Sequence, residues 1–190
     1  MIYPYEGKYP EIHPSVFMTD DVVIVGDVHV AEQANIWFGT VIRGDVNRVE
    51  IGARSNLQDN CTLHETWKKH RLVIGADVTV GHGAILHGCT IEDGCLIGMG
   101  AKVLDRAVVG SESLVAAGAV VREGFEVPPG SLVAGVPAKV VRPLNDEERA
   151  GGRQSAANYL FYVEQYRLHR DLERGLDFHS YLEYKRTGRL

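Results

Sequence analysis

Aliphatic residues recur at every sixth position over most of this sequence, and this period limits the folds that the chain can adopt. With three changes of phase, twenty successive positions of the series hold only Ile, Leu, Val or Met. They are Ile12, Met18, Ile24, Val30, Ile36, Ile42, Ile51, Leu57, Leu63, Ile74, Val80, Leu86, Ile91, Ile97, Val103, Val109, Val115, Val121, Val127 and Val133. A half-buried strand alternates with a period of two and a helix has a period of 3.6, so neither explains a period of six.

A period of six predicts an all-β solenoid with three sides. Each group of six residues supplies a short strand and a corner, and three groups make one coil of about 18 residues. Outside the inserted segment, the residue four places after each aliphatic is small or β-branched, except at Phe125. Both positions are expected to point inward, while neighbouring coils stack at the strand spacing of about 4.8 Å. Residues 12–138 then form about seven coils.

The chain changes character after the repeats. Pro137 and Pro143 cannot donate to a strand ladder, and Asn145 with Glu148 has the pattern of a helix N-cap. We expect a helix from there toward Gly175, packed along one face of the solenoid. The pair Gly151-Gly152 predicts a kink or break near its start. The predicted organisation is therefore an N-terminal segment 1–11, the repeats 12–138 and a C-terminal helical segment 139–190.

Composition excludes several classes of partner. The net charge of −5 argues against a nucleic-acid ligand. No apolar run approaches the roughly 18 residues of a membrane span, and the first residues do not resemble a signal peptide. Three cysteines cannot form a disulfide scaffold. These features predict a cytoplasmic protein without membrane contact.

Two of the eight histidines occupy matched positions in the repeat. His64 follows Leu63, and His87 follows Leu86. If the insertion 65–72 belongs to one enlarged repeat, the two histidines are neighbours on adjacent coils, which suits two ligands of one metal ion. His82 lies on the preceding face, so it would join the pair from another subunit of a threefold trimer. The alternative is that all three are ordinary surface histidines.

Several motifs around these histidines resemble those of the γ-class carbonic anhydrase family. They are Arg43-Gly44-Asp45, Asn56-Leu57-Gln58-Asp59-Asn60, Gly81-His82 and Leu86-His87-Gly88. The resemblance implies a left-handed parallel β-helix, a homotrimer and reversible hydration of CO₂ to bicarbonate. It also implies zinc bound by His64, His87 and the His82 of a neighbouring subunit. Iron and cobalt accept three imidazoles as well.

The resemblance suggests roles for further residues. Arg43, Asp45 and Asp59 would form ion pairs between subunits, with plain surface salt bridges as the alternative. Gln58 would bind the water on the metal, Asn56 would line the pocket, and Tyr159 would close over the site or simply pack the helix. Cys61 and Cys95 are expected in the core, whereas Cys89 is either core or a fourth ligand.

The sequence departs from the archetype of this family next to the first motif. Val46 stands where the archetype has a glutamate, and the loop after His64 is short and basic. Glu65 is the acid available to replace the lost carboxylate. Because of this departure, two other functions stay open. They are an acyl-CoA thioesterase or acyltransferase on the same scaffold, and a metal-binding assembly protein without catalytic activity.

Overall fold

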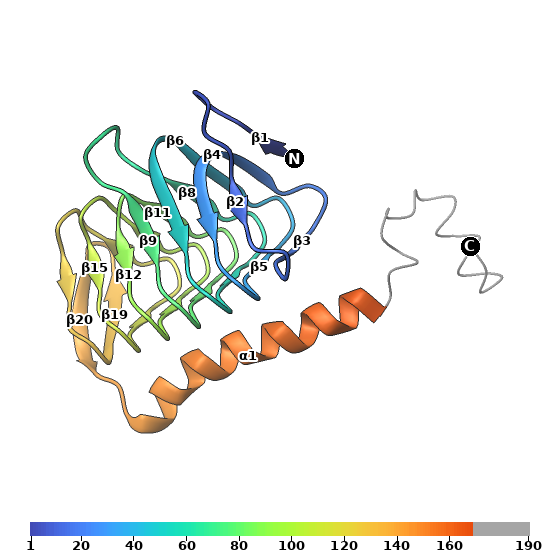
Figure 1. The fold of residues 1–190 in the computed structure, drawn as a ribbon. Coiled ribbons are helices and arrows are strands. Elements are labelled where there is room, and N and C mark those ends of the chain that lie inside the picture. The colour runs from blue at the N-terminus through green and yellow to red at the C-terminus, as the bar shows by residue number, and fades with distance from the viewer. Residues whose placement is uncertain (169–190) are drawn as a thin grey trace, which may run out of the picture. The chain divides into compact units, whose positions relative to one another are not determined.

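The structure is a computed structural model that describes residues 1–168. Its strands wind into a left-handed parallel β-helix of about seven three-sided coils (Figure 1). The period predicted the three-sided solenoid, and the family resemblance implied its left hand. Predicted inward positions lie opposite one another on adjacent coils, for example Ile24 and Ile42, or Leu63 and Leu86. The solenoid therefore forms because each coil presents the same aliphatic ladder to the next.

The strands form two sheets along the solenoid. The first sheet contains β1 (Ile2–Tyr3), β2 (Glu11–Ile12), β4 (Val23–Val30), β6 (Val41–Ile51), β8 (Thr62–His64), β9 (Leu72–Ile74), β11 (Ile85–His87), β12 (Thr90–Ile91), β14 (Lys102–Val103), β15 (Val108–Val109), β17 (Val120–Val121) and β18 (Glu126–Val127). The second contains β3 (Phe17–Met18), β5 (Asn35–Ile36), β7 (Asn56–Leu57), β10 (Thr79–Val80), β13 (Leu96–Ile97), β16 (Leu114–Val115), β19 (Ser131–Gly135) and β20 (Ala138–Pro143). The long strands β4 and β6 bend around a corner, so two faces of the prism join into one sheet.

The core lies inside the prism. The aliphatic ladder from Ile24 to Val133 is almost completely buried, together with small residues such as Ala34 and Ala84. Burying each large aliphatic side chain stabilises the fold by about 1.5–3 kcal/mol before opposing entropy is counted. Phe125, the large residue at a small position, packs against this core while staying partly exposed.

The insertion 65–72 leaves the register of the repeats intact. Leu63 on β8 is opposite Leu86 on β11, and Ile74 on β9 is opposite Ile91 on β12. The insertion thus replaces a single corner, which confirms that it belongs to one enlarged repeat. This register decides which side chains share the surface beside His64.

The solenoid ends in a hairpin followed by a helix. Strand β19 pairs antiparallel with β20, and helix α1 (Asp146–Leu168) begins after Asn145. The Asn145 side chain accepts a hydrogen bond from the backbone N–H of Glu148 at 2.8 Å, while the Glu148 carboxylate accepts one from the backbone N–H of Asn145 at 3.0 Å. This reciprocal pair confirms the predicted capping box.

Helix α1 is continuous through Gly151 and Gly152, so the expected break does not occur. A Cβ atom on Gly152 would lie 2.7 Å from the carbonyl oxygen of Gly94, whereas a Cβ on Gly151 would meet nothing within 4 Å. The lack of a side chain at Gly152 thus lets the backbone of α1 lie close to the solenoid corner at Gly94. The expected extension toward Gly175 lies outside the described residues. Within residues 1–168, no helix combines the length and the apolar character needed to cross a membrane.

Candidate metal centre

His64 and His87 stand directly opposite each other on β8 and β11. Each follows a leucine that points into the core, so both imidazoles lie on the outer surface of one face. Nδ1 of His64 is 3.1 Å from Nε2 of His87. The structure therefore brings together the two histidines that the repeat predicted to be neighbours.

His82 lies at the corner after β10, which belongs to the other sheet. Its Nδ1 is 2.7 Å from the Asp59 carboxylate, and its backbone N–H donates to the Gln58 side chain at 3.3 Å. The imidazole is about half exposed, with 46% of its side-chain surface accessible. Within a single chain, His82 therefore lies on a different face of the solenoid from His64 and His87.

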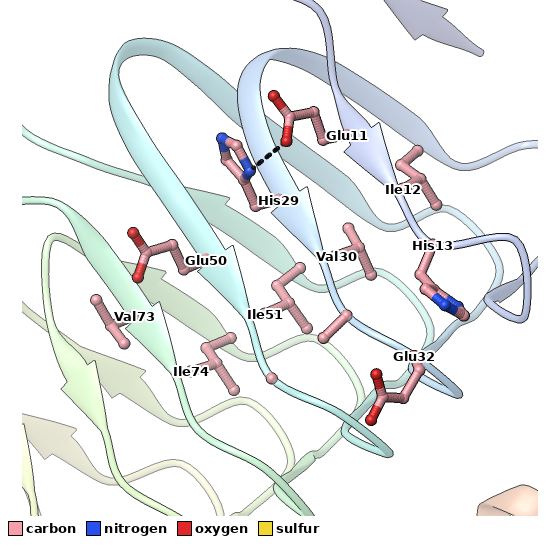
Figure 2. Close-up of a pocket in the computed structure, with 12 residues that line it drawn as sticks. Glu11, Ile12, His13, His29, Val30, Glu32, Glu50, Ile51, Val73 and Ile74 are labelled. Carbon is pink, nitrogen blue, oxygen red and sulfur yellow. Dashed lines mark ion pairs between the residues drawn. The ribbon is translucent and has the colours of Figure 1, made fainter.

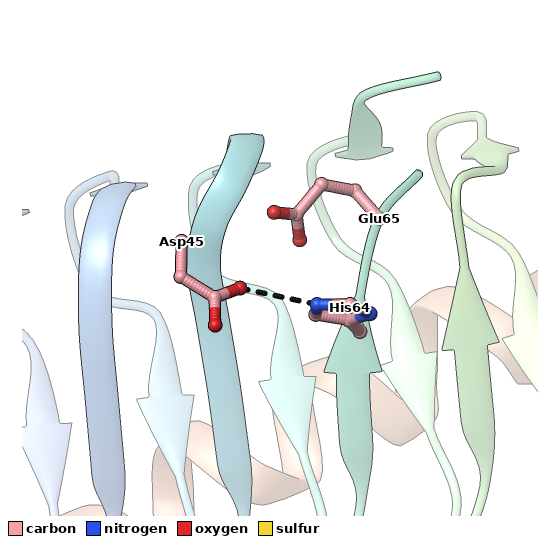
Figure 3. Close-up of side chains that lie close together, drawn as sticks. All are labelled: Asp45, His64 and Glu65. Atoms are coloured by element: carbon pink, nitrogen blue, oxygen red, sulfur yellow. Dashed lines mark hydrogen bonds and ion pairs between the residues drawn. The ribbon is translucent and has the colours of Figure 1, made fainter. Parts of the chain in front are cut away.

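Arg43 and Asp45 approach His64 from the coil below. The Arg43 guanidinium lies 2.7 Å from Nε2 of His64. The Asp45 carboxylate lies 3.1 Å from the same nitrogen (Figure 3). Burial, followed by the charge of Arg43, lowers the pKa of His64 and outweighs the opposite effect of Asp45. A lowered pKa favours the neutral imidazole, which is the form that binds a metal ion.

Glu65 is buried beside this group, a feature that sequence reasoning missed. One carboxylate oxygen accepts hydrogen bonds from the backbone N–H groups of Val46 and Asn47 at 3.0 and 2.7 Å. Burial raises the pKa of Glu65 to about 6, although these two hydrogen bonds oppose the change. Its second oxygen has no partner among the described residues. Donor atoms of Asp45, His64 and Glu65 all lie within 4.8 Å of one another (Figure 3).

Asp105 is a second residue that sequence reasoning missed. It follows β14, one coil beyond His87, and its carboxylate lies 2.5 Å from Nδ1 of His87. The Thr66 hydroxyl donates to the other oxygen at 2.5 Å. Counting about 18 residues onward from His87 would have located it, because coils of the solenoid repeat at that distance.

The remaining predicted site residues lie on β7, directly after it, or on the helix. Asn56 is buried and donates to the Thr79 hydroxyl at 2.8 Å, while Gln58 donates to Asn56 at 3.3 Å. The Tyr159 ring stands edge-on to Trp37, with centroids 5.5 Å apart. Tyr159 therefore packs against Trp37 within this chain, and its closure over the site stays a prediction.

All three cysteines are buried in the core cluster. Burial raises the pKa of Cys61, Cys89 and Cys95 to about 12. Their side chains lie in the core, whereas His64 and His87 lie on the outer surface. The structure thus assigns Cys89 to the core.

A pocket of about 640 Å³ lies on a different part of the solenoid, over β2, β4, β6 and β9 (Figure 2). Glu11, His29 and Glu50 form one outward row along it, and Nδ1 of His29 is 3.1 Å from Glu11. None of the predicted site residues lines this pocket. The side chains of His64 and His87 expose 22% and 35% of their surface.

The donors at the histidine pair fit a metal ion such as zinc. Two nitrogens at about 2.1 Å from tetrahedral zinc are about 3.4 Å apart. The observed separation of 3.1 Å between the two ring nitrogens is close to that value. Neutral imidazoles are also preferred ligands of zinc, iron and cobalt.

Known proteins are similar to this chain in sequence and in fold. A family model described as "Bacterial transferase hexapeptide (six repeats)" matches residues 71–104 and 88–123. A carbonic anhydrase of Geobacillus kaustophilus is 49% identical over 148 residues, which cover 78% of this chain and 81% of that protein. A solved Bacillus cereus structure, described as a candidate acetyltransferase, has a TM-score of 0.85 and 46% identity, covering 87% of this chain and 96% of that one.

A longer relative shows the same similarity. Gamma carbonic anhydrase 1, a mitochondrial protein of Arabidopsis thaliana, is 45% identical over 157 residues. The match covers 80% of this chain and 57% of the relative, so the chain spans little more than half of that protein. Together with the fold and the histidine arrangement, these similarities show that the chain belongs to the γ-class carbonic anhydrase family of hexapeptide-repeat proteins.

Proposed function

We propose that this protein catalyses the reversible hydration of CO₂ to bicarbonate at a zinc site shared between the subunits of a homotrimer. His64 and His87 of one subunit would hold the ion together with the His82 of its neighbour. The observation that carries this proposal is the separation of 3.1 Å between ring nitrogens of His64 and His87. Iron or cobalt would suit the same ligands.

Three neutral imidazoles leave one coordination position open, which is typical of catalytic rather than structural zinc. Zinc bound there would lower the pKa of water to about 7 and so supply hydroxide for attack on CO₂. Other residues of the chain set the protonation and the orientation of the side chains around the proposed site. Burial and the nearby Arg43 keep His64 neutral, and Asn56 holds Gln58 so that its carbonyl oxygen faces the backbone of His82.

An apolar surface around His82 supports the trimer. The register places Phe38, Asp59, His82 and Met99 in one row along a corner of the solenoid. Phe38 and Met99 expose 42% and 60% of their surface. Among residues 1–168, no metal-binding group includes His82. Large apolar side chains exposed beside such a histidine suit a contact with a second copy. In that contact, Arg43 would meet the Asp59 of the neighbour.

Glu65 is the residue we propose to replace the carboxylate that is lost at Val46. The backbone N–H of Val46 holds one oxygen of Glu65, and the other oxygen is without a partner among the described residues. A carboxylate oxygen of Glu65 lies in the group formed with Asp45 and His64. A carboxylate thus stays beside the proposed centre, although it comes from a different position of the chain.

An acyltransferase or acyl-CoA thioesterase is the second candidate. The similarity to the Bacillus cereus structure described as a candidate acetyltransferase favours it. A transferase that uses a histidine as general base has no need of two imidazoles held together by the fold. The histidine pair therefore favours CO₂ hydration, and acetyl-CoA hydrolysis or transfer without CO₂ hydration would favour the second candidate.

The test is stopped-flow CO₂ hydration on protein whose metal content per chain has been measured. Zinc, cobalt and anaerobically loaded iron forms are compared with His64→Ala, and His13→Ala serves as the control. We expect turnover in at least one metal form that disappears in His64→Ala and is kept in His13→Ala. One metal per chain without hydration in any form would contradict the proposed reaction while leaving the metal site in place.

A further inference from the structure

We propose that Asp105 is a positioning residue of the metal centre, because it orients the imidazole of His87. Thr66 in turn orients the carboxylate of Asp105. The inference rests on the proposed metal site, but not on CO₂ as the substrate. Asp105 follows β14, and its two oxygens have separate partners, Nδ1 of His87 and the hydroxyl of Thr66, each at 2.5 Å. A carboxylate held at both oxygens cannot rotate away from the imidazole.

This contact determines which nitrogen of His87 is available to a metal ion. A neutral imidazole carries one N–H, and an N–H that donates to a carboxylate leaves the lone pair on the other nitrogen. Here the Asp105 carboxylate draws the proton to Nδ1. Nε2 is then the free ligand atom, and it is this atom that faces His64 at 3.1 Å.

His82 has the same arrangement on another face of the solenoid. Its Nδ1 lies 2.7 Å from the Asp59 carboxylate, so Nε2 is again the free nitrogen. His64 differs, because its Nε2 lies against Arg43 and Asp45. The same carboxylate-to-Nδ1 pairing at two of the three proposed ligands is expected of outer groups that orient a metal site.

Thr66 connects this orientation to the insertion 65–72. Its backbone N–H donates to the carbonyl of His70 at 3.1 Å, which closes the loop, while its hydroxyl reaches Asp105, two coils beyond β8. The short, basic insertion 65–72 thus contacts the proposed metal ligand His87 indirectly. The Thr66 hydroxyl binds Asp105, and Asp105 binds His87. A purely structural alternative is that Thr66 and Asp105 only anchor the loop.

The experiment measures zinc and cobalt affinity by competition with a chelator for the full-length protein and its variants. Asp105→Ala should weaken binding by about 10–100-fold, and Asp105→Asn by less, because an amide oxygen accepts the hydrogen bond without the charge. Thr66→Val should weaken binding, whereas Thr66→Ser should restore it. Asp93→Asn is the matched control, since Asp93 also sits at a corner but accepts from the backbone of Ala76.

Two further measurements separate positioning from simple anchoring. The visible spectrum of the cobalt form should shift in Asp105→Asn, because the orientation of one ligand changes. The thermal unfolding of the metal-free variants reports any loss of fold. Lower stability of metal-free Asp105→Asn and Asp105→Ala, with unchanged metal affinity and cobalt spectrum, would overturn the inference.

The outcome also separates this inference from the proposed reaction. Tight metal binding in the unsubstituted protein that weakens in the Asp105 variants, without CO₂ turnover, would support the positioning role and contradict the anhydrase. Absence of zinc and cobalt binding in the unsubstituted protein would overturn both.

Discussion

Nδ1 of His64 lies 3.1 Å from Nε2 of His87 because the residues that precede them, Leu63 and Leu86, are opposite each other in the core. Two short strands on adjacent coils thereby present two imidazoles to one point in space. The geometry follows from the stacking of coils and needs no special loop.

Replacing either of these histidines with alanine should remove the metal while preserving the fold. His64→Ala and His87→Ala are each expected to reduce bound zinc from about one ion per chain to nearly none, since a structural or catalytic site needs at least three ligands. Both side chains lie outside the core, so thermal unfolding of the metal-free proteins should change little. Elemental analysis measures the first effect, and full zinc content in His87→Ala would refute it.

Mixed trimers test whether His82 comes from a neighbour. His64→Ala and His82→Ala homotrimers should each lack metal. After unfolding and refolding of an equal mixture, about one quarter of the sites should combine an intact His64 with an intact His82 from the next subunit. Metal content measured on the mixed species should rise accordingly. If all ligands belonged to one chain, mixing would restore nothing.

Charge placed on the apolar row beside His82 should break the assembly. Met99→Lys puts an ammonium group where we expect a second copy to pack, at a cost of about 2 kcal/mol or more per contact. Native mass spectrometry should then show monomers and a parallel loss of metal. Val108→Lys, on the outward side of β15, is the control and should leave the assembly intact. Intact trimers in Met99→Lys would contradict the predicted interface.

Two neighbouring glycines of α1 should respond oppositely to alanine. Gly151→Ala is expected to stabilise the protein by up to about 1 kcal/mol, because alanine has the higher helix propensity and the added Cβ meets nothing within 4 Å. Gly152→Ala should destabilise it by about 1–3 kcal/mol, since its Cβ would lie 2.7 Å from the Gly94 carbonyl oxygen. Urea unfolding measures both, and equal effects would show that α1 does not pack as described.

The capping box should lose its contribution in acid. The hydrogen bond from Arg142, followed by that from the backbone of Asn145, lowers the pKa of Glu148 to about 2. A lowered carboxyl pKa adds stability above the ordinary value of 4.5, and this contribution disappears as the pH falls toward 2. Glu148→Gln should therefore be less stable than the unsubstituted protein at pH 7, with a smaller difference near pH 3. A difference that does not vary with pH would contradict this role.

Much of the architecture is predictable because the repeat is local and strict. A six-residue period requires a three-sided solenoid, and the slot after each inward aliphatic residue is defined by counting. The positions of His64, His87 and Arg43 on one face follow from that count. The predicted capping box at Asn145 is likewise a local pattern, and it begins the helix where expected.

The break expected at Gly151-Gly152 is wrong for a reason that involves a distant residue. Helix propensity considers only the chain near the glycines, whereas Gly152 lies against the carbonyl of Gly94 on a solenoid corner. A larger residue would force the helix away, so the low propensity is offset by packing. No local pattern contains that information.

The sequence by itself determined the solenoid, its register and the facing pair His64 and His87, because these depend on a repeated spacing between neighbours along the chain. Only the tertiary structure decided that Glu65 is buried, with one oxygen that has no partner within residues 1–168. It also decided that Asp105 contacts His87 and Thr66. Those features depend on the direction of side chains and on the path of a non-repeating loop. Both are set by packing between residues of different coils, which spacing along the chain does not encode.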